Sequence, residues 1–293
     1  MDALQVYVGG ELVPATDAKV SVWDSGFQHG DSVYEGIRVY GGRILQLHEH
    51  IERLYQSAHA IGIHPVMTRE ETAEAIKATV RANGLYDDTH LRVTLTRGSK
   101  VMTGMDPRLN TAGDPLLVVI AEPKPPVFGH AGVTLITSSV RRMAVECLDP
   151  KIHSCNQLGQ ILAKLEANHA GADEALMLDV HGMVAETNSA NFFIVHHGTV
   201  MTSPRHTCLN GLTRAWILKN AERLGADGAL EDDLTLTDVY TADEAFMCGT
   251  VCEVVPVVAV DGRTIGTGAP GPLTQAILDG YRAYTRTAGV PVD

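Results

Sequence analysis

The opening of the chain contains short runs in which apolar and polar residues alternate, the pattern of strands with one buried face. Residues 6–8 and 11–13 flank Gly9 and Gly10, which can take the positive φ of a tight turn, so we expect a hairpin there. Similar runs predict further strands over residues 33–40, 43–45, 91–96 and 116–121.

Between these strands the hydrophobic period lengthens from two residues to that of a helix. Over residues 47–61, one helical face carries Leu47, Ile51, Leu54, Ala58 and Ile61. A second helix is predicted to begin at Thr68, which with Glu71 has the spacing of a capping box, and to end at Gly84. We therefore interpret residues 1–121 as a small α+β domain.

A proline-rich stretch follows this first part. Pro123, Pro125 and Pro126 fix φ and lack a backbone donor, so we interpret residues 122–132 as an interdomain linker. Residues 133–293 then form a larger domain, with strands expected over 133–138, 174–178, 192–195, 199–202 and most of 245–260, and helices over 157–170, 213–224 and 272–285. The predicted fold class is α/β (α+β) with two domains.

Composition and charge narrow the function classes. The 293 residues include 23 Lys and Arg against 35 Asp and Glu, a net charge of −12, which argues against nucleic acid or an anionic membrane as a partner. No apolar run is long enough to span a bilayer, and residues 1–5 lack signal-peptide character. Five cysteines without a C-x-x-C pair are typical of reduced thiols, so we expect a cytoplasmic protein without a metal site.

Three pieces of the sequence can bind an anion, although each signal is weak alone. Residues 210–214 place Gly211 directly before a helix, whose free N–H groups favour a phosphate. Residues 248–250 offer a hydroxyl and backbone amides after a strand, and Arg53 can add a two-pronged contact. The alternative is an ordinary turn, an ordinary helix cap and a solvated surface arginine.

Several longer segments match the pattern of a known family in the right order. They are residues 22–38 (VWDSGFQHGDSVYEGIR), 50–57, 95–98 (LTRG), 161–167 (ILAKLEA), 184–193 (VAETNSANFF), 211–214 (GLTR) and 249–257 (GTVCEVVPV). The chain thereby resembles the class IV aminotransferases, which include branched-chain and D-amino-acid aminotransferases and aminodeoxychorismate lyase. The resemblance implies a two-domain fold-type IV architecture, like that of D-amino-acid aminotransferase, with pyridoxal 5'-phosphate as the cofactor.

The resemblance also implies which residues hold the cofactor. Glu186 corresponds to the carboxylate beside the pyridine nitrogen, which keeps the ring protonated so that the ring can take up electrons. Asn191 corresponds to an asparagine that shapes the site loop. The phosphate site corresponds to Arg53, Leu212, Thr213 and Thr250.

The family's lysine holds the cofactor as a Schiff base and shuttles a proton. It precedes an asparagine by a short gap, and in residues 149–158 (DPKIHSCNQL) the shortest such spacing falls on His153, with Lys151 two residues earlier. In one interpretation Lys151 is the Schiff-base lysine, and His153 handles protons from the same side of an extended segment. In the other, His153 replaces the lysine and ordinary transamination fails. Lys164 is expected to be an exposed helix residue.

Substrate contacts are implied in the same way. Tyr34 corresponds to an aromatic wall of the site, and Val251 and Cys252 are candidate substrate contacts. The candidates for binding a substrate carboxylate are Arg38, Arg97 and Lys100. For each of these cations the alternative is an ion pair with a surface acid.

The sequence therefore predicts a pyridoxal-phosphate-dependent aminotransferase that moves an amino group between a branched-chain or D-amino acid and a 2-oxo acid. Two alternatives stay open: a lyase on the same cofactor, resembling aminodeoxychorismate lyase, and a cofactor-independent or non-transaminating descendant with His153 at the lysine position. Because members of the family are commonly dimers, the resemblance also implies a homodimer.

Overall fold

The computed structural model describes residues 4–129 and 131–293, which form two compact units. The first unit extends to Pro125 and also contains residues 152–156 and 285–293, whereas the second contains 126–151 and 157–284. Residues 1–3 and, inside the predicted linker, His130 lie outside the described residues. The domain boundaries at 121 and 133 stay a prediction, and nothing in the sequence pattern points to the two later segments of the first unit.

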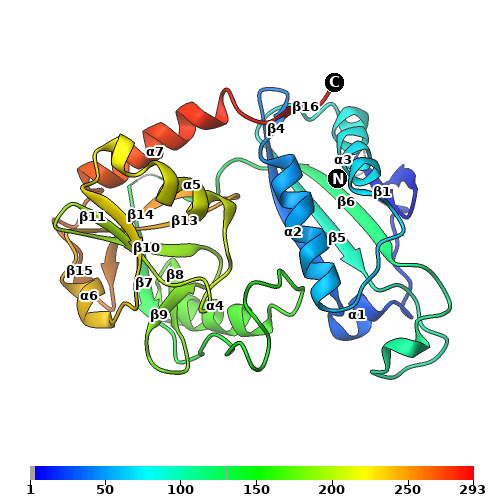
Figure 1. Cartoon of the computed structure of the whole chain (residues 1–293), viewed down its shortest axis with the longest axis horizontal. Coiled ribbons are helices and arrows are strands. Elements are labelled where there is room, and N and C mark those ends of the chain that lie inside the picture. Colours follow the sequence, from blue (N-terminus) through cyan, green and yellow to red (C-terminus); the bar gives the residue numbers. More distant parts are fainter. Residues whose placement is uncertain (1–3, 130) are drawn as a thin grey trace. The chain divides into compact units, whose positions relative to one another are not determined.

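The first unit is built on a seven-stranded sheet in the order β16-β4-β3-β5-β6-β1-β2 (Figure 1). Its strands are β1 (Gln5–Val8), β2 (Glu11–Pro14), β3 (Ser32–Tyr40), β4 (Arg43–Ile44), β5 (Thr89–Thr96), β6 (Leu116–Pro123) and β16 (Val290–Pro291). Its helical segments are α1 (Ser25–His29), α2 (Leu47–Ala60), α3 (Arg69–Asn83) and the 3-10 turn η1 (Pro107–Leu109). Apolar residues of β3, β5, β6, α2 and α3 share one core.

The strands and the two long helices expected in this part are confirmed. The capping box is present, since Glu71 N donates to Thr68 Oγ1 while the Glu71 carboxylate accepts from Thr68 N, and Gly84 ends α3 with a φ of 61°. Helix α1 was not expected, because five residues are too few to show a helical period. Its signal is local: the Asp24 carboxylate accepts a 2.7 Å hydrogen bond from Gly26 N at the start of the helix.

Residues 152–156 join the edge of this unit next to the start of β3. Tyr34 N donates to the His153 carbonyl at 2.9 Å, and Cys155 N donates to the Ser32 carbonyl at 2.9 Å. His153 N donates to Ser57 Oγ of α2 at 3.2 Å. Hydrogen bonds from two elements therefore fix the backbone that carries the His153 side chain.

The second unit is built on a nine-stranded sheet in the order β12-β11-β10-β13-β14-β7-β8-β9, with β15 paired to β14. Its strands are β7 (Val133–Thr137), β8 (Glu174–Leu178), β9 (Val184–Thr187), β10 (Asn191–His196), β11 (Thr199–Thr202), β12 (Gly228–Glu231), β13 (Glu244–Gly249), β14 (Glu253–Val260) and β15 (Arg263–Thr264). Its helical segments are α4 (Leu158–Ala170), α5 (Leu212–Asn220), η2 (Glu222–Leu224), α6 (Leu236–Tyr240) and α7 (Pro272–Thr285).

The expected elements of the second part are also confirmed, with one difference. The helix predicted over 213–224 ends at Asn220, and a 3-10 turn from Glu222 to Leu224 follows it. Strand β9 was not expected, because it has only four residues and is buried along its whole length, so it shows no alternation. Among the described helices, none combines the length and the apolar character that a bilayer crossing requires.

Candidate active site

Glu186 is a buried carboxylate on β9 in the second unit. The Glu186 side chain pairs with Arg142, whose Nη2 lies 2.7 Å from Oε1. Glu186 Oε2 accepts hydrogen bonds from Asn191 Nδ2 at 3.0 Å and from Leu209 N at 3.3 Å. Three donors from three segments therefore fix the carboxylate, which is 6% exposed.

Burial raises the pKa of Glu186, while Arg142 and the Leu209 N–H act against that rise. A carboxylate oxygen can accept two hydrogen bonds, so Oε1, with its contact to Arg142, keeps capacity for a further N–H donor. The carboxylate can thus accept a hydrogen bond from a protonated ring nitrogen without displacing its protein partners. This is the chemistry that the pyridine nitrogen of pyridoxal phosphate requires.

Asn191 connects this carboxylate to the start of helix α5. Its Nδ2 also donates to the Leu209 carbonyl at 2.9 Å. A Cβ atom on Gly211 would lie 2.1 Å from Asn191 Oδ1, so the backbone at the helix start can approach the asparagine only because residue 211 is glycine. Asn191 thus fixes both the carboxylate and the loop that leads into the helix.

Helix α5 offers the anion-binding end that the sequence predicts. Gly211 is its N-cap residue and, of the side chains described, none caps the first turn. The free N–H groups and the positive end of the helix dipole favour a phosphate there. Thr213 is 1% exposed, and its Oγ1 lies 3.2 Å from the Tyr281 hydroxyl, while Leu212 is half-buried. The second unit therefore presents a fit for both ends of the cofactor.

The loop after β13 contains the other predicted residues of this unit. Thr250 and Val251 are half-buried and Cys252 is buried. Burial raises the pKa of the Cys252 thiol to about 12, so the thiol is neutral at physiological pH. Cys252 Sγ lies 3.8 Å from the Gly249 carbonyl, which holds the thiol inside its own loop. The assignment of Val251 and Cys252 to the substrate stays a prediction.

Glu35 is the centre of a second polar cluster, in the first unit, and the sequence motifs did not single it out. Its Oε1 accepts from Arg53 Nε at 2.8 Å and lies 3.4 Å from His153 Nδ1. Its Oε2 accepts from Arg53 Nη2 at 2.7 Å and lies 2.7 Å from His50 Nδ1. One carboxylate on β3 therefore joins two side chains of α2 to the segment 152–156.

Charge balance in this cluster is set by Arg53. Burial alone would raise the pKa of Glu35, but Arg53 and His153 outweigh burial and hold that pKa well below its usual value. Burial lowers the pKa of His50 and of His153, although Glu35 acts against this. The cluster is best described as an ionised Glu35–Arg53 pair with two neutral imidazoles.

The position of Arg53 bears on its predicted role at the phosphate. The Nε–Nη2 edge of its guanidinium is committed to Glu35 in a two-pronged pair, and the side chain is only 11% exposed. The predicted two-pronged contact of Arg53 is therefore made with a carboxylate of the protein. The role of Arg53 at the phosphate stays a prediction.

The Tyr34 ring packs against His153, and Arg92 packs against the Tyr34 ring. The Tyr34 and His153 ring centroids are 4.0 Å apart, and the Arg92 guanidinium lies 3.4 Å from the centroid of the Tyr34 ring. Arg92 Nη2 also contacts Cys155 Sγ at 3.8 Å. The aromatic wall predicted at Tyr34 therefore contacts His153 directly, while its contact with a substrate stays a prediction.

Lys151 is placed differently from His153. Lys151 lies in a turn at residues 150–151, so the expectation that the two side chains share one side of an extended segment is wrong. Its side chain is 50% exposed, and its Nζ lies 3.2 Å from the neighbouring Asp149 carboxylate. Lys164 Nζ lies 2.8 Å from the buried Glu174 carboxylate rather than in open solvent. The role of Lys151 as the cofactor lysine stays a prediction.

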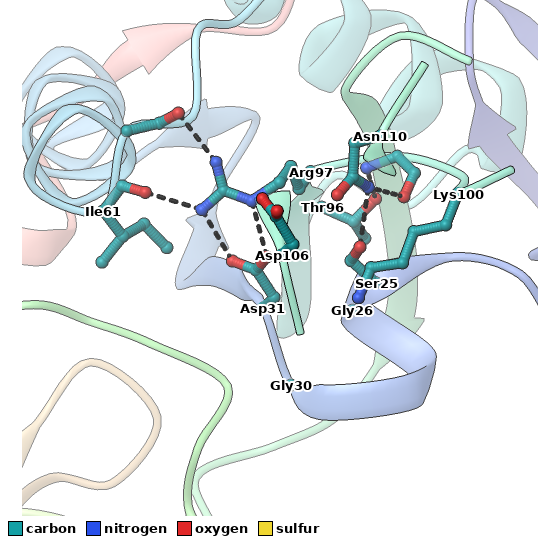
Figure 2. A network of polar contacts seen from close by, with 12 residues as sticks. Ser25, Gly26, Gly30, Asp31, Ile61, Thr96, Arg97, Lys100, Asp106 and Asn110 are labelled. Carbon is teal, nitrogen blue, oxygen red and sulfur yellow. Dashed lines mark hydrogen bonds and ion pairs between the residues drawn. The ribbon is translucent and has the colours of Figure 1, made fainter. Parts of the chain in front are cut away.

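The candidate carboxylate receptors have protein partners. Arg97 is bound by both oxygens of Asp31, at 2.5 and 2.9 Å, and by the carbonyls of Ile61 and Gly62, as Figure 2 shows. Lys100 is buried and donates to the Gly104 carbonyl. Arg38 is fully buried and donates to the Lys124 carbonyl at 2.6 Å and to Asp88 at 3.2 Å. These bonds support the alternative in which each cation is bound by groups of the protein itself. A substrate role for Arg38 or Arg97 stays a prediction.

Comparison with known proteins decides the family. The family model for amino-transferase class IV matches residues 32–260. This chain belongs to the class IV aminotransferases. It is 45% identical to branched-chain-amino-acid aminotransferase-like protein 2 of Arabidopsis thaliana over 99% of the chain, but it spans only 52% of that relative.

Two further matches extend over whole proteins. A putative branched-chain-amino-acid aminotransferase of Methanocaldococcus jannaschii is 42% identical over 99% of both chains. A crystal structure of the branched-chain amino acid aminotransferase from Thermobaculum terrenum in its PLP form matches with a TM-score of 0.86 and 28% identity, covering 97% of this chain and 94% of the other. The two-sheet architecture is thus the fold-type IV fold that the sequence resemblance implied.

We expect stability to fall on mild acidification because of the buried imidazoles. Their pKa values are lowered in the folded protein, so the unfolded chain binds more protons below about pH 6.5. Unfolding should become easier by up to about 1.4 kcal/mol per pH unit for each such histidine between pH 6.5 and its folded pKa. Glu35 adds nothing in this window, because above about pH 5 its carboxyl is ionised in both the folded and the unfolded protein.

The measurement is urea unfolding of the protein and of His50→Gln between pH 7.5 and pH 5. His50 is the fully buried imidazole, so its replacement should flatten the decline with pH. His181→Gln, an exposed histidine on a turn, serves as the control and should keep the original slope. An unchanged slope in His50→Gln would show that His50 is not neutral in the folded protein.

Proposed function

We propose that this chain binds pyridoxal phosphate and transfers an amino group between an amino acid and a 2-oxo acid. The observation that carries the proposal is Glu186, a buried carboxylate fixed by Arg142, Asn191 and Leu209 N beside an uncapped helix start. Membership of the class IV aminotransferases and the likeness to a structure named as the PLP form of an aminotransferase support it.

Each residue has a role in this proposal. When bound, pyridoxal phosphate supplies a ring that takes up the electron pair left at the α-carbon of the amino acid. Glu186 accepts a hydrogen bond from the ring nitrogen and so keeps it protonated. The first N–H groups of α5, at Leu212 and Thr213, bind the phosphate together with Thr250.

We propose Lys151 as the amine that holds the cofactor. Its ion pair with Asp149 is half-exposed and lies within a turn, and such pairs contribute at most about 1 kcal/mol, so the amine can leave it. Lys164, in contrast, is tied to the buried Glu174.

One observation favours a second candidate, a cofactor-binding protein that does not transaminate. The His153 side chain is 13% exposed against 50% for Lys151, and the His153 backbone is fixed at both the N–H and the carbonyl. An imidazole in place of the lysine forms no stable imine, so the cofactor would be bound without a covalent bond.

Reduction with borohydride distinguishes the two candidates. We expect the purified protein with pyridoxal phosphate to absorb as a lysine-bound cofactor, and borohydride followed by peptide mapping to find the cofactor fixed to Lys151. Lys151→Ala should abolish this labelling, whereas Lys219→Ala, which removes an exposed lysine of the same unit, should not. Labelling of no lysine, with the cofactor released on denaturation, would contradict the role of Lys151 and support the second candidate.

For the amino donor we propose a branched-chain L-amino acid, with a D-amino acid as the alternative. The names of the Methanocaldococcus relative and of the Thermobaculum structure support the first choice. Adding L-leucine or D-alanine to the loaded protein and following the conversion of the cofactor to its amine form decides between the donors. A lyase would convert it poorly with either amino acid.

We further propose a homodimer, supported by an apolar face on helix α4. The residues of this face recur at helical spacing and are 45 to 67% exposed: Leu158, Ile161, Leu162 and Leu165. The opposite side of the same helix is buried through Ala163 and Ala167. A stripe of four large apolar side chains is typical of a surface covered by a partner, and we assign it to a second copy of this chain.

The dimer can be tested by a charge on that face. Ile161→Asp should shift the protein from dimer to monomer in analytical ultracentrifugation, because it places a carboxylate within an apolar interface. Val66→Asp makes the same kind of change at an exposed apolar residue outside α4 and should leave the mass unchanged. A wild-type protein that sediments as a monomer would contradict the proposal.

A cytoplasmic location is proposed from the cysteines. All five are free thiols in the structure, and three of them, Cys208, Cys248 and Cys252, are buried. This is the usual state in a reducing compartment.

A further inference from the structure

Helix α7 is anchored at its first turn by a buried carboxylate of β13. Glu244 Oε2 accepts hydrogen bonds from Thr274 N at 2.7 Å and from Thr274 Oγ1 at 2.6 Å, and Glu244 Oε1 accepts from Leu273 N at 3.0 Å. Strand β13 ends at Gly249 and leads directly to Thr250. The start of α7 therefore has a fixed position on the strand that leads to one of the residues proposed to bind the phosphate.

Near the other end of α7, two consecutive residues contact the two segments of the proposed phosphate site. The Tyr281 hydroxyl lies 3.2 Å from Oγ1 of Thr213 in the first turn of α5, and both side chains are buried. The Tyr281 ring also packs edge-on against Trp216 of α5, with ring centroids 5.2 Å apart (Figure 1). Arg282 Nε donates to Glu253 Oε2 at 3.1 Å. All these residues lie in the second unit, so one helix contacts both segments of the site.

Glu253 has a backbone conformation that the surrounding structure must hold. It follows the turn at residues 250–252 and pairs with Gly249 where β13 and β14 meet. Its φ is 61°, in the left-handed region that glycine adopts freely and that strains a residue with a side chain. Its side chain is only 5% exposed, so the carboxylate needs partners within the protein, and the Arg282 guanidinium is one of them. The ion pair therefore stabilises the conformation that ends the Thr250 turn.

The Tyr281 hydroxyl keeps its proton at physiological pH, because burial raises the pKa of Tyr281 above its ordinary value. As a neutral phenol it can donate to Thr213 Oγ1. Phenylalanine in its place would remove this hydrogen bond and leave the ring against Trp216. The hydroxyl can thus be tested without opening a cavity in the core.

We propose that Tyr281 and Arg282 are positioning residues for the phosphate of pyridoxal phosphate. Tyr281 fixes the start of α5 through Thr213, and Arg282 fixes the turn that contains Thr250 through Glu253. This inference rests on the proposed function. N–H and hydroxyl donors bind an anion well when they are held in the binding geometry beforehand, and α7 holds both groups of donors from one helix.

The first test compares pyridoxal phosphate with pyridoxal, which has the same ring and no phosphate, by absorbance titration of the full chain. We expect Tyr281→Phe to weaken binding of pyridoxal phosphate about fivefold, the contribution of one hydrogen bond. Arg282→Gln should weaken it about tenfold, because a hydrogen bond to a charged group is lost. The affinity for pyridoxal should change by less than about twofold in both variants, since its ring does not contact the phosphate site. An equal loss for both ligands is the result of general destabilisation and would overturn the proposal.

Tyr240→Phe is the matched control for the hydroxyl. Tyr240 OH donates to Asp261 at 2.7 Å in the same unit, and its removal should leave both affinities unchanged. Arg282→Lys keeps a positive charge near Glu253 and should recover most of the affinity that Arg282→Gln loses. An unchanged affinity for pyridoxal phosphate in Tyr281→Phe or in Arg282→Gln, or an equal loss in Tyr240→Phe, would overturn the proposal.

The second test removes the backbone strain at residue 253. Glycine adopts a φ of 61° without strain, so Glu253→Gly no longer needs the ion pair with Arg282. In the Glu253→Gly background we expect Arg282→Gln to change the affinity for pyridoxal phosphate by less than about twofold, because the two substitutions act on one contact. The same loss in both backgrounds would show that Arg282 does not act through Glu253 and would overturn the proposal.

Amino transfer, measured on the same proteins, separates this inference from the proposed function. A wild type that prefers pyridoxal phosphate over pyridoxal, loses that preference in the α7 variants and converts no amino acid would refute amino transfer while supporting the role of α7. A wild type that transfers amino groups, with variants that keep the preference, would support the proposed function and overturn this inference.

Discussion

A buried carboxylate needs N–H donors in place of the water that would otherwise solvate it. Both units of the chain contain such a carboxylate, and in each unit it fixes the segments that supply the donors. In the first unit, Glu35 gathers Arg53, His50 and His153 from α2 and from the segment 152–156. In the second, Glu186 gathers Arg142 and Asn191 from a loop and a strand. Because an unpaired buried charge costs several kcal/mol, the segments that supply these donors are held in place.

The two carboxylates satisfy the constraint in different ways, and the difference suits different tasks. The two-pronged pair with Arg53 neutralises Glu35 and keeps its pKa low, so this carboxylate can orient imidazoles without taking their protons. Glu186 has a pKa raised by burial despite Arg142, and one of its oxygens keeps capacity for another donor. Glu35 is therefore suited to fixing protein groups, and Glu186 to binding a protonated ring.

Much of the fold and part of the site could be predicted from local sequence. The capping box at Thr68, the glycine end at Gly84 and the apolar face of α2 act within a few residues, so the sequence shows them directly. Glu186, Asn191 and Gly211 lie in motifs long enough to be matched to a family, and the structure brings all three together.

The remaining part depends on contacts between distant segments. Arg142 lies in an irregular loop and pairs with Glu186, which is 44 positions later in the chain. The sequence pattern around Glu35 indicates only an inward-facing residue of a strand. The mistaken expectation for Lys151 and His153 has the same origin: Pro150 and Lys151 form a turn, and only the hydrogen bonds of residues 153 and 155 to β3 fix the segment that follows. No local pattern in the sequence indicates hydrogen bonds between such distant segments.

We propose that Glu186 binds the ring nitrogen of pyridoxal phosphate, and this contact can be tested directly. The most direct measurement is the 15N NMR shift of ring-labelled pyridoxal phosphate bound to the protein and to Glu186→Gln. We expect a protonated ring nitrogen at neutral pH in the wild type and its loss in the variant, with the phosphate still bound. A ring nitrogen whose protonation is the same in both proteins would contradict it.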